Sequence, residues 1–435
     1  MASFEILPWQ ITAANAEHRV QVTIRLPQGD RSFEIIFPDA IGPLGQPEVA
    51  DGLFTLLLFS AMHQGLPLHF PMPLSRQLLK IQARQQEIAA AWFPSLRRVE
   101  VAATPREGPA DAVLPSRRTA ATFTAGVDSM LTALENRDSL DFLFYMQGFG
   151  PLTELEGPIF QPMASHMKKV ADKLGRPFHV GRMTYRALAD ICAPWMDNHG
   201  AALASLGLFM GNSVERLLIP SSNPWEHQSP WGSHHLLDES WSTERVGIQL
   251  HGSRFNRPHK VQHLVNHYPD FVGDLAVCWT DDVPNQARNC SRCEKCLRTM
   301  CSLAMCGWER WGEAFCEPLN LERVRALKLQ PGNLRNEWEP MLRFGKEHAP
   351  DHPVTTAVEV VVANARLRIF LAELQKIEGD WHRIPSLVKL AHWWRDEVWQ
   401  SWSDRQRGWL RKKIKGLATT QPASVIRALW GKDAL

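Results

Sequence analysis

The chain has 435 residues, with 48 Lys and Arg against 46 Asp and Glu, and hydrophobic residues make up 44% of it. At about 150 residues per domain this length predicts two or three domains, and the composition excludes a wholly disordered chain. The formal net charge of +2 argues against a protein that coats nucleic acid by bulk charge. No apolar run approaches the roughly 18 residues of a membrane-spanning helix, and the N-terminus lacks the pattern of a signal peptide. We therefore expect a cytoplasmic protein without integral membrane association.

Residues 1–102 predict a small N-terminal α/β domain. Apolar residues alternate with polar ones over 20–26 and again over 33–37, which indicates two half-buried strands. The sequence Pro-Gln-Gly-Asp at 27–30 predicts the hairpin turn between them. We expect two helices after the hairpin, around 50–64 and 74–92.

The central part of the chain alternates strand-like and helical segments. Residues 103–118 carry three prolines and a glycine without periodicity and are interpreted as a linker. From residue 119 to 306, strands alternate with helices, which predicts a parallel sheet with helices on both faces. The expected strands lie at 121–124, 141–146, 177–180, 216–220 and 246–250, and the expected helices at 129–136, 158–174 and 199–211.

The remaining residues, 307–435, predict a helical, Trp-rich and basic region. Residues 355–377 form its clearest helical pattern. Residues 404–435 carry eight Lys and Arg against two Asp. This segment is interpreted either as a contact for nucleic acid or an anionic membrane surface, or as a solvated basic face whose tryptophans pack on the domain.

The most informative segment follows the first central strand and opens a helix. It reads Thr-Ala-Gly-Val-Asp-Ser over Thr124–Ser129. Small residues let the backbone approach a ligand, and the free N–H groups of a helix N-terminus with two hydroxyls form an anion cradle. Asp128 falls in the first helical turn, where it could cap the helix or hold a Mg²⁺ that bridges phosphates. The alternative is a capped strand-to-helix turn that holds no ligand.

This segment resembles the loop Ser-Gly-Gly-x-Asp-Ser of the PP-loop ATP pyrophosphatases. Thr124 keeps the hydroxyl, whereas Ala125 replaces the first glycine, which either weakens ATP binding or is absorbed by a small shift. The resemblance implies a Rossmann-like, HUP-type parallel sheet that uses ATP and Mg²⁺. It also assigns Asp128 and Ser129 catalytic roles. The ATP-binding residues that it implies are Thr124, Ala125, Gly126, Val127, Asp128 and Ser129.

Four cysteines have the spacing of a metal site. Cys290, Cys293 and Cys296 are separated by two residues each, and Cys278 lies upstream. Four thiolates close a tetrahedral Zn²⁺ site, which is structural because it leaves no open position. The alternative is a set of buried or redox-active thiols.

The order of these motifs is similar to that of 7-cyano-7-deazaguanine synthase, a PP-loop protein that binds one zinc. In that family a helix with a lysine precedes the zinc cysteines, and here Lys260 precedes Cys278; Ser291 replaces the usual glycine between the cysteines. Tyr145 and Gln147 match the family's Tyr-x-Gln segment at the nucleotide end of the sheet. The resemblance covers about 119–306. It implies a catalytic Lys260, nucleotide contacts from Tyr145 and Gln147, and zinc bound by the four cysteines.

A long segment between the two motifs, rich in hydroxyls, imidazoles and indoles, follows a predicted strand. Ligands of such sheets bind at the carboxyl ends of the strands, so we interpret it as a substrate-recognition loop. An ordinary loop with local hydrogen bonds is the alternative. The candidate substrate residues are Ser221, Ser222, Ser233, His234, His235 and Arg254.

The function that these features predict is an AMP- and pyrophosphate-forming ligase. It would adenylate a carboxylate of a small-molecule substrate for capture by a nucleophile such as ammonia. A second hypothesis is an enzyme that modifies a tRNA or a protein terminus, or a carboxylate-activating epimerase similar to the UDP-N-acetylmuramoyl-alanyl-glutamate epimerases. A third is a non-catalytic nucleotide-binding module. The sequence leaves the oligomeric state open, a homodimer included.

Overall fold

The chain divides into two compact units, Met1–Leu319 and Asn320–Leu435. The computed structural model describes residues 2–107, 118–149, 160–226, 229–278 and 288–376. The basic segment 404–435 and most of the predicted linker therefore lie outside the described residues. In the described part, no helix has both the length and the apolar character needed to cross a membrane.

The N-terminal part of the first unit contributes six strands and two long helices. The strands are β1 (Phe4–Ile6), β2 (Gln10–Ala14), β3 (Glu17–Arg25), β4 (Arg31–Pro38), β5 (Leu68–His69) and β6 (Val101–Ala102). The helices are α1 (Gln46–Gln64) and α2 (Arg76–Trp92). The hairpin β3–β4 and both helices confirm the sequence prediction, whereas the short strands β1, β2, β5 and β6 were not predicted.

The central part alternates strands and helices as the sequence predicted. The strands are β7 (Arg118–Thr122), β8 (Phe142–Gln147), β9 (Phe178–Met183), β10 (Val214–Pro220) and β11 (Gly247–His251). The helices are α3 (Val127–Glu135), α4 (Phe160–Leu174), α5 (Trp195–Phe209), α6 (Arg257–His267), α7 (Pro269–Val272), α8 (Glu294–Met305) and α9 (Trp311–Ala314). Short 3₁₀ turns lie at Asp39–Ile41, Tyr185–Ala187 and Glu239–Trp241.

All these strands join one mixed sheet of 11 strands. Its order is β11-β10-β7-β8-β9-β4-β3-β1-β5-β6, with β2 paired to β3. The five central strands pair in parallel, while β4 joins β9 in the antiparallel direction and extends the sheet into the N-terminal part. If the five parallel strands β7 to β11 are numbered one to five in chain order, their spatial order, read from β9 to β11, is 3-2-1-4-5. This is the doubly wound arrangement, whose ligand crevice lies where the order reverses, here between β7 and β10.

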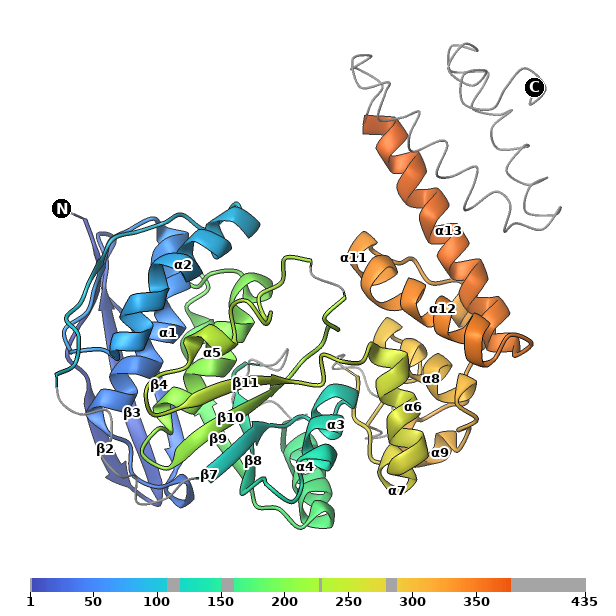
Figure 1. Cartoon of the computed structure of the whole chain (residues 1–435), viewed down its shortest axis with the longest axis horizontal. Helices are drawn as coiled ribbons and strands as arrows, with labels where there is room; N and C mark the ends of the chain where they lie inside the picture. The colour runs from blue at the N-terminus through green and yellow to red at the C-terminus, as the bar shows by residue number, and fades with distance from the viewer. Residues whose placement is uncertain (1, 108–117, 150–159, 227–228, 279–287, 377–435) are drawn as a thin grey trace. The chain divides into compact units, whose positions relative to one another are not determined.

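Side chains alternate between two hydrophobic clusters on opposite faces of the sheet. On β8, Phe142 and Phe144 belong to one cluster and Leu143 and Tyr145 to the other. The first cluster contains the buried residues of α1 and α5, which pack side by side (Figure 1). The second contains those of α3, α4, α6 and α8. Both faces are therefore covered, as a parallel sheet requires.

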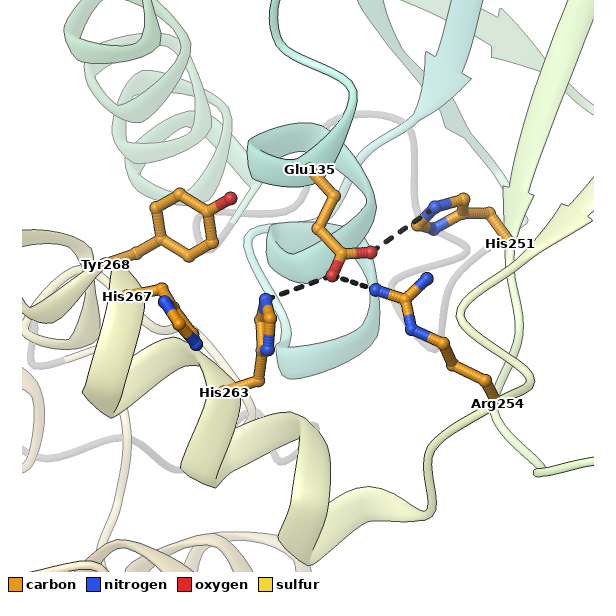
Figure 2. A pocket seen from close by; sticks show the side chains of 6 residues that line it. All are labelled: Glu135, His251, Arg254, His263, His267 and Tyr268. Carbon is orange, nitrogen blue, oxygen red and sulfur yellow. Dashed lines mark hydrogen bonds and ion pairs between the residues drawn. The ribbon is translucent and has the colours of Figure 1, made fainter.

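Helices α3 and α6 pack against each other with their N-termini at the same end. Asp128 in the first turn of α3 contacts Lys260 of α6, and Glu135 at the end of α3 contacts His263, one turn further along α6 (Figure 2). The pair thus presents two polar clusters, one near each end of α3.

The second unit is helical over its described residues, which confirms the helical C-terminal region. It contains α10 (Leu321–Arg325), α11 (Pro331–Asn333), a π-helical turn (Leu334–Trp338), α12 (Glu339–His348) and α13 (Pro353–Lys376). Trp338 and Phe344 are buried, and Arg366 of α13 forms an ion pair of 2.8 Å with Glu339. The predicted helix 355–377 corresponds to α13.

Candidate functional site

The loop from β7 to α3 has a left-handed turn at Ala125. Its φ is +55°, a conformation that normally favours glycine. The methyl group is fully buried in the second hydrophobic cluster, so it does not occupy the open side of the loop. The turn directs the carbonyl oxygen of Ala125 to the backbone N–H of Ala276, which donates a hydrogen bond of 2.8 Å. Ala125 is therefore accommodated, and its carbonyl ties the loop to the segment that leads to Cys278.

Two hydroxyl groups fix the shape of this loop. Ser129 Oγ accepts a hydrogen bond from the backbone N–H of Thr124 (3.2 Å) and lies 3.1 Å from Thr124 Oγ1. Thr124 Oγ1 in turn accepts from the N–H of Gly126, the N-cap of α3. The first N–H groups of a helix have no intrahelical acceptor, and Gly126 has no side chain that could cap those of α3. The loop has the form of an anion cradle.

Asp128 is held by two cations of α6. Its carboxylate accepts from Arg257 at 2.7 Å and from Lys260 Nζ at 2.8 Å. Burial by itself raises the pKa of Asp128, but the charges of Arg257 and Lys260 outweigh this effect and lower the pKa to about 2. The carboxylate is therefore ionised at every physiological pH, and it orients both cations rather than capping the helix.

Lys260 connects the ends of the two strands between which the strand order reverses. Its side chain is fully buried, and Nζ also donates to the backbone carbonyl of Ser221, directly after β10, at 2.5 Å. Asp128 follows β7 through the loop. The Asp128–Lys260–Ser221 contact therefore lies where the strand order reverses, which is the position expected for a ligand in this architecture.

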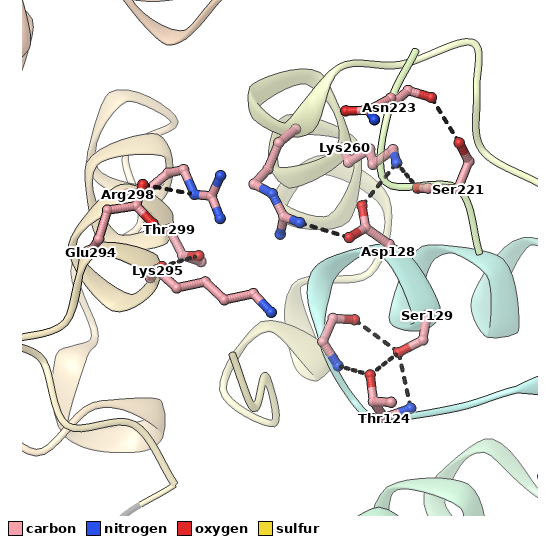
Figure 3. A network of polar contacts seen from close by, with 12 residues as sticks. Thr124, Asp128, Ser129, Ser221, Asn223, Lys260, Glu294, Lys295, Arg298 and Thr299 are labelled. Carbon is pink, nitrogen blue, oxygen red and sulfur yellow. Dashed lines mark hydrogen bonds and ion pairs between the residues drawn. The ribbon is translucent and has the colours of Figure 1, made fainter. Parts of the chain in front are cut away.

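Helix α8 adds two further cations to this cluster. Figure 3 shows Lys295 and Arg298 directed from α8 toward the side of α3 that carries Asp128. The charge of Lys295 contributes to the lowered pKa of Asp128. Arg298 is 6% exposed and lies 3.6 Å from Glu294. Among the residues that the structure describes, four basic side chains and two carboxylates thus lie in this cluster, beside the first N–H groups of α3.

The four predicted cysteines come together in the structure. Their sulfur atoms all lie within 4.8 Å of one another, and the Cys278–Cys293 and Cys290–Cys296 pairs are each 3.9 Å apart. A disulfide sulfur pair lies at about 2.05 Å, whereas a tetrahedron with Zn–S bonds of about 2.3 Å has sulfur edges of about 3.8 Å. The cluster therefore fits a metal ion such as zinc and does not fit a disulfide.

The backbone around the cysteines is shaped to receive thiolates. Cys290 Sγ accepts from the N–H groups of Arg292 (3.4 Å) and Cys293 (3.3 Å), and Cys293 Sγ accepts from Cys296 N (3.4 Å). Ser291, between them, has a left-handed φ of +58°. Cys293 is the N-cap of α8, so the cysteine cluster fixes the start of the helix that carries Lys295 and Arg298.

Asn289 connects the two halves of the cysteine cluster. Its fully buried side chain accepts from the N–H groups of Val277 (2.7 Å) and Cys278 (3.0 Å) and donates to the carbonyls of Leu275 and Ala314. These four bonds hold Cys278 beside Cys290. Sequence reasoning did not identify this residue.

Tyr145 and Gln147 lie on β8, next to β7 in the sheet. Tyr145 stacks on Phe160 with ring centroids 6.2 Å apart, and burial raises the pKa of its phenol to about 12. Gln147 is 1% exposed. Both residues are buried in the sheet, and their contact with a nucleotide remains a prediction.

The predicted substrate residues occupy three different places. Ser221 contacts Lys260, and its Oγ donates to the carbonyl of Asn223, whereas Ser222 is exposed. Arg254 contacts Glu135 at the far end of α3. Ser233 donates to Asp238, His234 packs against Trp92 and His235 against Trp225. Only Ser221 joins the Asp128 cluster through a described contact.

Sequence reasoning missed three basic residues of the cluster: Arg257, Lys295 and Arg298. Lys295 lies inside the cysteine motif and Arg298 one turn later, so their spacing of three placed them on one helix face. The pairing of that face with α3 could not be read from the sequence, because it depends on where the cysteine cluster anchors α8.

No family model matches the sequence, and neither a curated protein nor a solved structure matches it.

Proposed function

We propose that this chain is an AMP- and pyrophosphate-forming enzyme of the PP-loop type, which adenylates the carboxylate of a small-molecule substrate. The observation that carries the proposal is the Asp128–Lys260–Arg257 cluster beside the open helix N-terminus, at the switch point of the sheet. Cations beside the N–H groups of a helix N-terminus favour a polyphosphate over a neutral ligand.

The backbone supports the resemblance on which this proposal also rests. The family has glycine where this chain has Ala125 and Ser291, and both residues have φ values in the left-handed region, +55° and +58°. The chain thus departs from the family motifs at two positions whose backbone still has the form that glycine favours. This agreement is expected if the motifs are related.

In the proposed reaction a substrate carboxylate oxygen attacks the α-phosphorus of ATP, and the bond to the pyrophosphate oxygen breaks. The loop N–H groups and Lys260, Arg257 and Lys295 would stabilise the charge of the departing pyrophosphate. Each oxygen of Asp128 keeps a lone pair besides those used by Arg257 and Lys260. Asp128 is therefore the side chain that would contact a Mg²⁺, which would supply neutralising charge on the phosphates.

We assign zinc as the metal of the four cysteines, with a structural role. A site of four thiolates leaves no open position for chemistry. Because Cys293 caps α8, metal binding would hold Lys295 and Arg298 against the loop. This role is indirect, through the position of the helix.

Binding of pyrophosphate and ATP to the full chain tests the proposal. Isothermal titration with Mg²⁺ is expected to show binding of both, and Lys260→Met is expected to weaken pyrophosphate binding at least tenfold, because it removes a buried cation. Lys168→Met is the matched control, since Lys168 is an exposed lysine of α4 whose partner is Asp172. Absence of ATP binding to the wild type would favour a turn without a ligand, and ATP binding without pyrophosphate formation would favour a non-catalytic module.

A further inference from the structure

The N-terminal part of the first unit contains an edge strand, β2, at the side of the sheet remote from the candidate site. Among the described strands β2 pairs only with β3, and β4, β9 and β8 separate β3 from β7 (Figure 1). All residues of β2 are exposed except Ile11, which is half-buried. Because an edge strand presents unpaired N–H and C=O groups, it can pair with a strand of another chain.

The hairpin between β2 and β3 determines which backbone groups point outward. Ala14 pairs with Glu17, and the two residues between them, Asn15 and Ala16, have left-handed φ values of +54° and +57°. Two consecutive left-handed residues form a type I′ turn, which is typical of a two-residue hairpin. In such a hairpin the residues that flank the turn bond to each other, so the N–H and C=O groups of Ala14 face β3.

The alternation along β2 then leaves two residues that face outward. Hydrogen-bonded and non-hydrogen-bonded pairs alternate between antiparallel strands, so Thr12 bonds to β3 as Ala14 does. The N–H and C=O groups of Ile11 and Ala13 point away from β3. The other side of β3 agrees with this phase, because Pro38, which has no N–H group, lies opposite Glu17.

The outward groups of β2 have no partner in the part of the chain that the structure describes. No described residue donates to the carbonyls of Ile11 and Ala13 or accepts from their outward N–H groups. Natural proteins block exposed edges with charged residues, prolines or a covering loop. The segment Gln10–Ala14 contains neither a charge nor a proline. This edge is therefore open to pairing.

The edge at the opposite end of the sheet is treated differently. On β11 the N–H group of Ile248 donates to Ser242 Oγ at 3.0 Å, and that of Leu250 donates to Glu239 Oε1 at 3.3 Å. Side chains of the preceding segment thus occupy the donors of this edge. The chain blocks one end of its sheet and leaves the β2 edge available.

We propose that β2 pairs in the antiparallel direction with β2 of a second copy of this chain, about a twofold axis at Thr12. Ile11 then lies opposite Ala13 of the partner subunit, and each of the two equivalent pairs forms two hydrogen bonds. Thr12 lies opposite Thr12 of the partner subunit, and Thr–Thr pairs stabilise antiparallel strands. This self-complementary arrangement is the one that a closed dimer requires.

The side chains on both faces of β2 suit a second copy. Ile11 lies on the face of Val20 and packs against the first hydrophobic cluster, so Ala13 of the partner subunit would cover its exposed part with an apolar neighbour. Thr12 lies on the solvent face, opposite Arg19. Since the strand is uncharged, two copies bring no like charges together. Self-pairing also satisfies both edges at once, whereas a strand of another protein satisfies only one.

Sedimentation velocity of the full chain tests the proposal. A pair of five-residue strands is smaller than a standard interface, so we expect a change from monomer to dimer between about 1 and 100 µM. Thr12→Lys places two ammonium groups opposite each other and should weaken the dimer about tenfold. Gln21→Lys is the matched control, because Gln21 is exposed on the same face of β3 and lies away from the axis.

Cysteine cross-linking tests the register. The two Thr12 Cα atoms of a non-hydrogen-bonded pair lie about 4.5 Å apart, within the range of a disulfide. Thr12→Cys treated with diamide as oxidant should therefore give a covalent dimer on a non-reducing gel. Gln10→Cys should not, since the register separates its Cα atom from its counterpart by about 14 Å. The wild type measures the background from the native cysteines.

Four results would overturn the proposal. A monomer at every concentration would leave the edge for a strand of another protein or for none. A dimer that Thr12→Lys does not weaken would place the interface elsewhere. Cross-linking of Thr12→Cys no higher than in the wild type, or equal in Gln10→Cys, would exclude this register. None of these measurements involves ATP, so the dimer and the proposed function fail or hold independently.

Discussion

The two ends of helix α3 hold their carboxylates in different ways. Asp128 at the N-terminal end is paired with Arg257 and Lys260, whose charges lower the pKa of Asp128 to about 2. Glu135 at the C-terminal end is surrounded by Arg254 and by histidines whose pKa values burial lowers. The first end is built as a permanent charge cluster, suited to a polyphosphate. The second end instead surrounds its carboxylate with histidines for which burial disfavours the charged form.

The largest effect is expected when one of the metal ligands is removed, and this change tests the Asp128 end of α3. Cys296→Ser should lose the metal, reduce the free energy of unfolding by more than about 3 kcal/mol and release α8. Because α8 carries Lys295 and Arg298, pyrophosphate binding should be lost as well. Metal analysis, thermal unfolding and titration measure the three effects.

Cys306→Ser is the control for this change, since Cys306 lies at the end of α8 outside the cluster. It should keep the metal and shift stability by about 1 kcal/mol or less. A Cys296→Ser protein that still holds one equivalent of zinc would contradict the assignment.

The next effect compares the two carboxylates directly. Asp128→Asn leaves the fully buried Lys260 without its counter-charge, so it should cost about 3 kcal/mol of stability. Glu135→Gln should cost about 1 kcal/mol, because Arg254 and His263 remain partly exposed. Urea unfolding at pH 7 measures both, and an equal cost for the two variants would remove the distinction between the ends.

A pH dependence follows from the lowered pKa of Asp128. The pKa is about 2 in the folded protein against 3.8 as the ordinary value. The stabilisation is therefore fully present above about pH 4 and is lost as the pH falls toward 2, a change of about 2 kcal/mol. Urea unfolding of the wild type between pH 5 and 2 should be steeper in pH than that of Asp128→Asn, and parallel curves would argue against the ion pairs.

The smallest effect concerns the left-handed turn at Ala125. Ala125→Gly relieves the backbone conformation but loses a buried methyl group, so the stability should change by less than about 1 kcal/mol. Ala133→Gly, in the interior of α3, lacks this relief and should cost more, about 1 kcal/mol from backbone entropy together with the lost methyl contacts. A larger cost for Ala125→Gly than for Ala133→Gly would show that the turn does not favour glycine.

Much of the sheet was predictable because each central strand is a short apolar run in the sequence, and helical segments separate these runs. The elements β7 to β11 and α3 to α5 follow from alternation of short apolar runs and helical segments. The strands β1, β5 and β6 have only two or three residues, too few for a periodic signal. These strands form because the folded chain returns to the side of the sheet beyond β3, which depends on tertiary contacts rather than on the local sequence.

The candidate site was predictable where it is contiguous and where cysteines mark it. The loop Thr124–Ser129 and the four cysteines are motifs in the sequence, and Lys260 was reached only through a resemblance. The positions of Arg257 and Lys295 beside Asp128, and the polar cluster around Glu135, arise from the packing of α3, α6 and α8, which no spacing in the sequence specifies.

The identity of the products formed from ATP tests the central claim most directly. The full chain with Mg²⁺, ATP and small-molecule fractions of a cell extract should yield AMP and pyrophosphate by mass spectrometry. This yield should be absent in Lys260→Met and retained in Lys168→Met. Formation of ADP and phosphate, or AMP formation that is unchanged in Lys260→Met, would contradict the account.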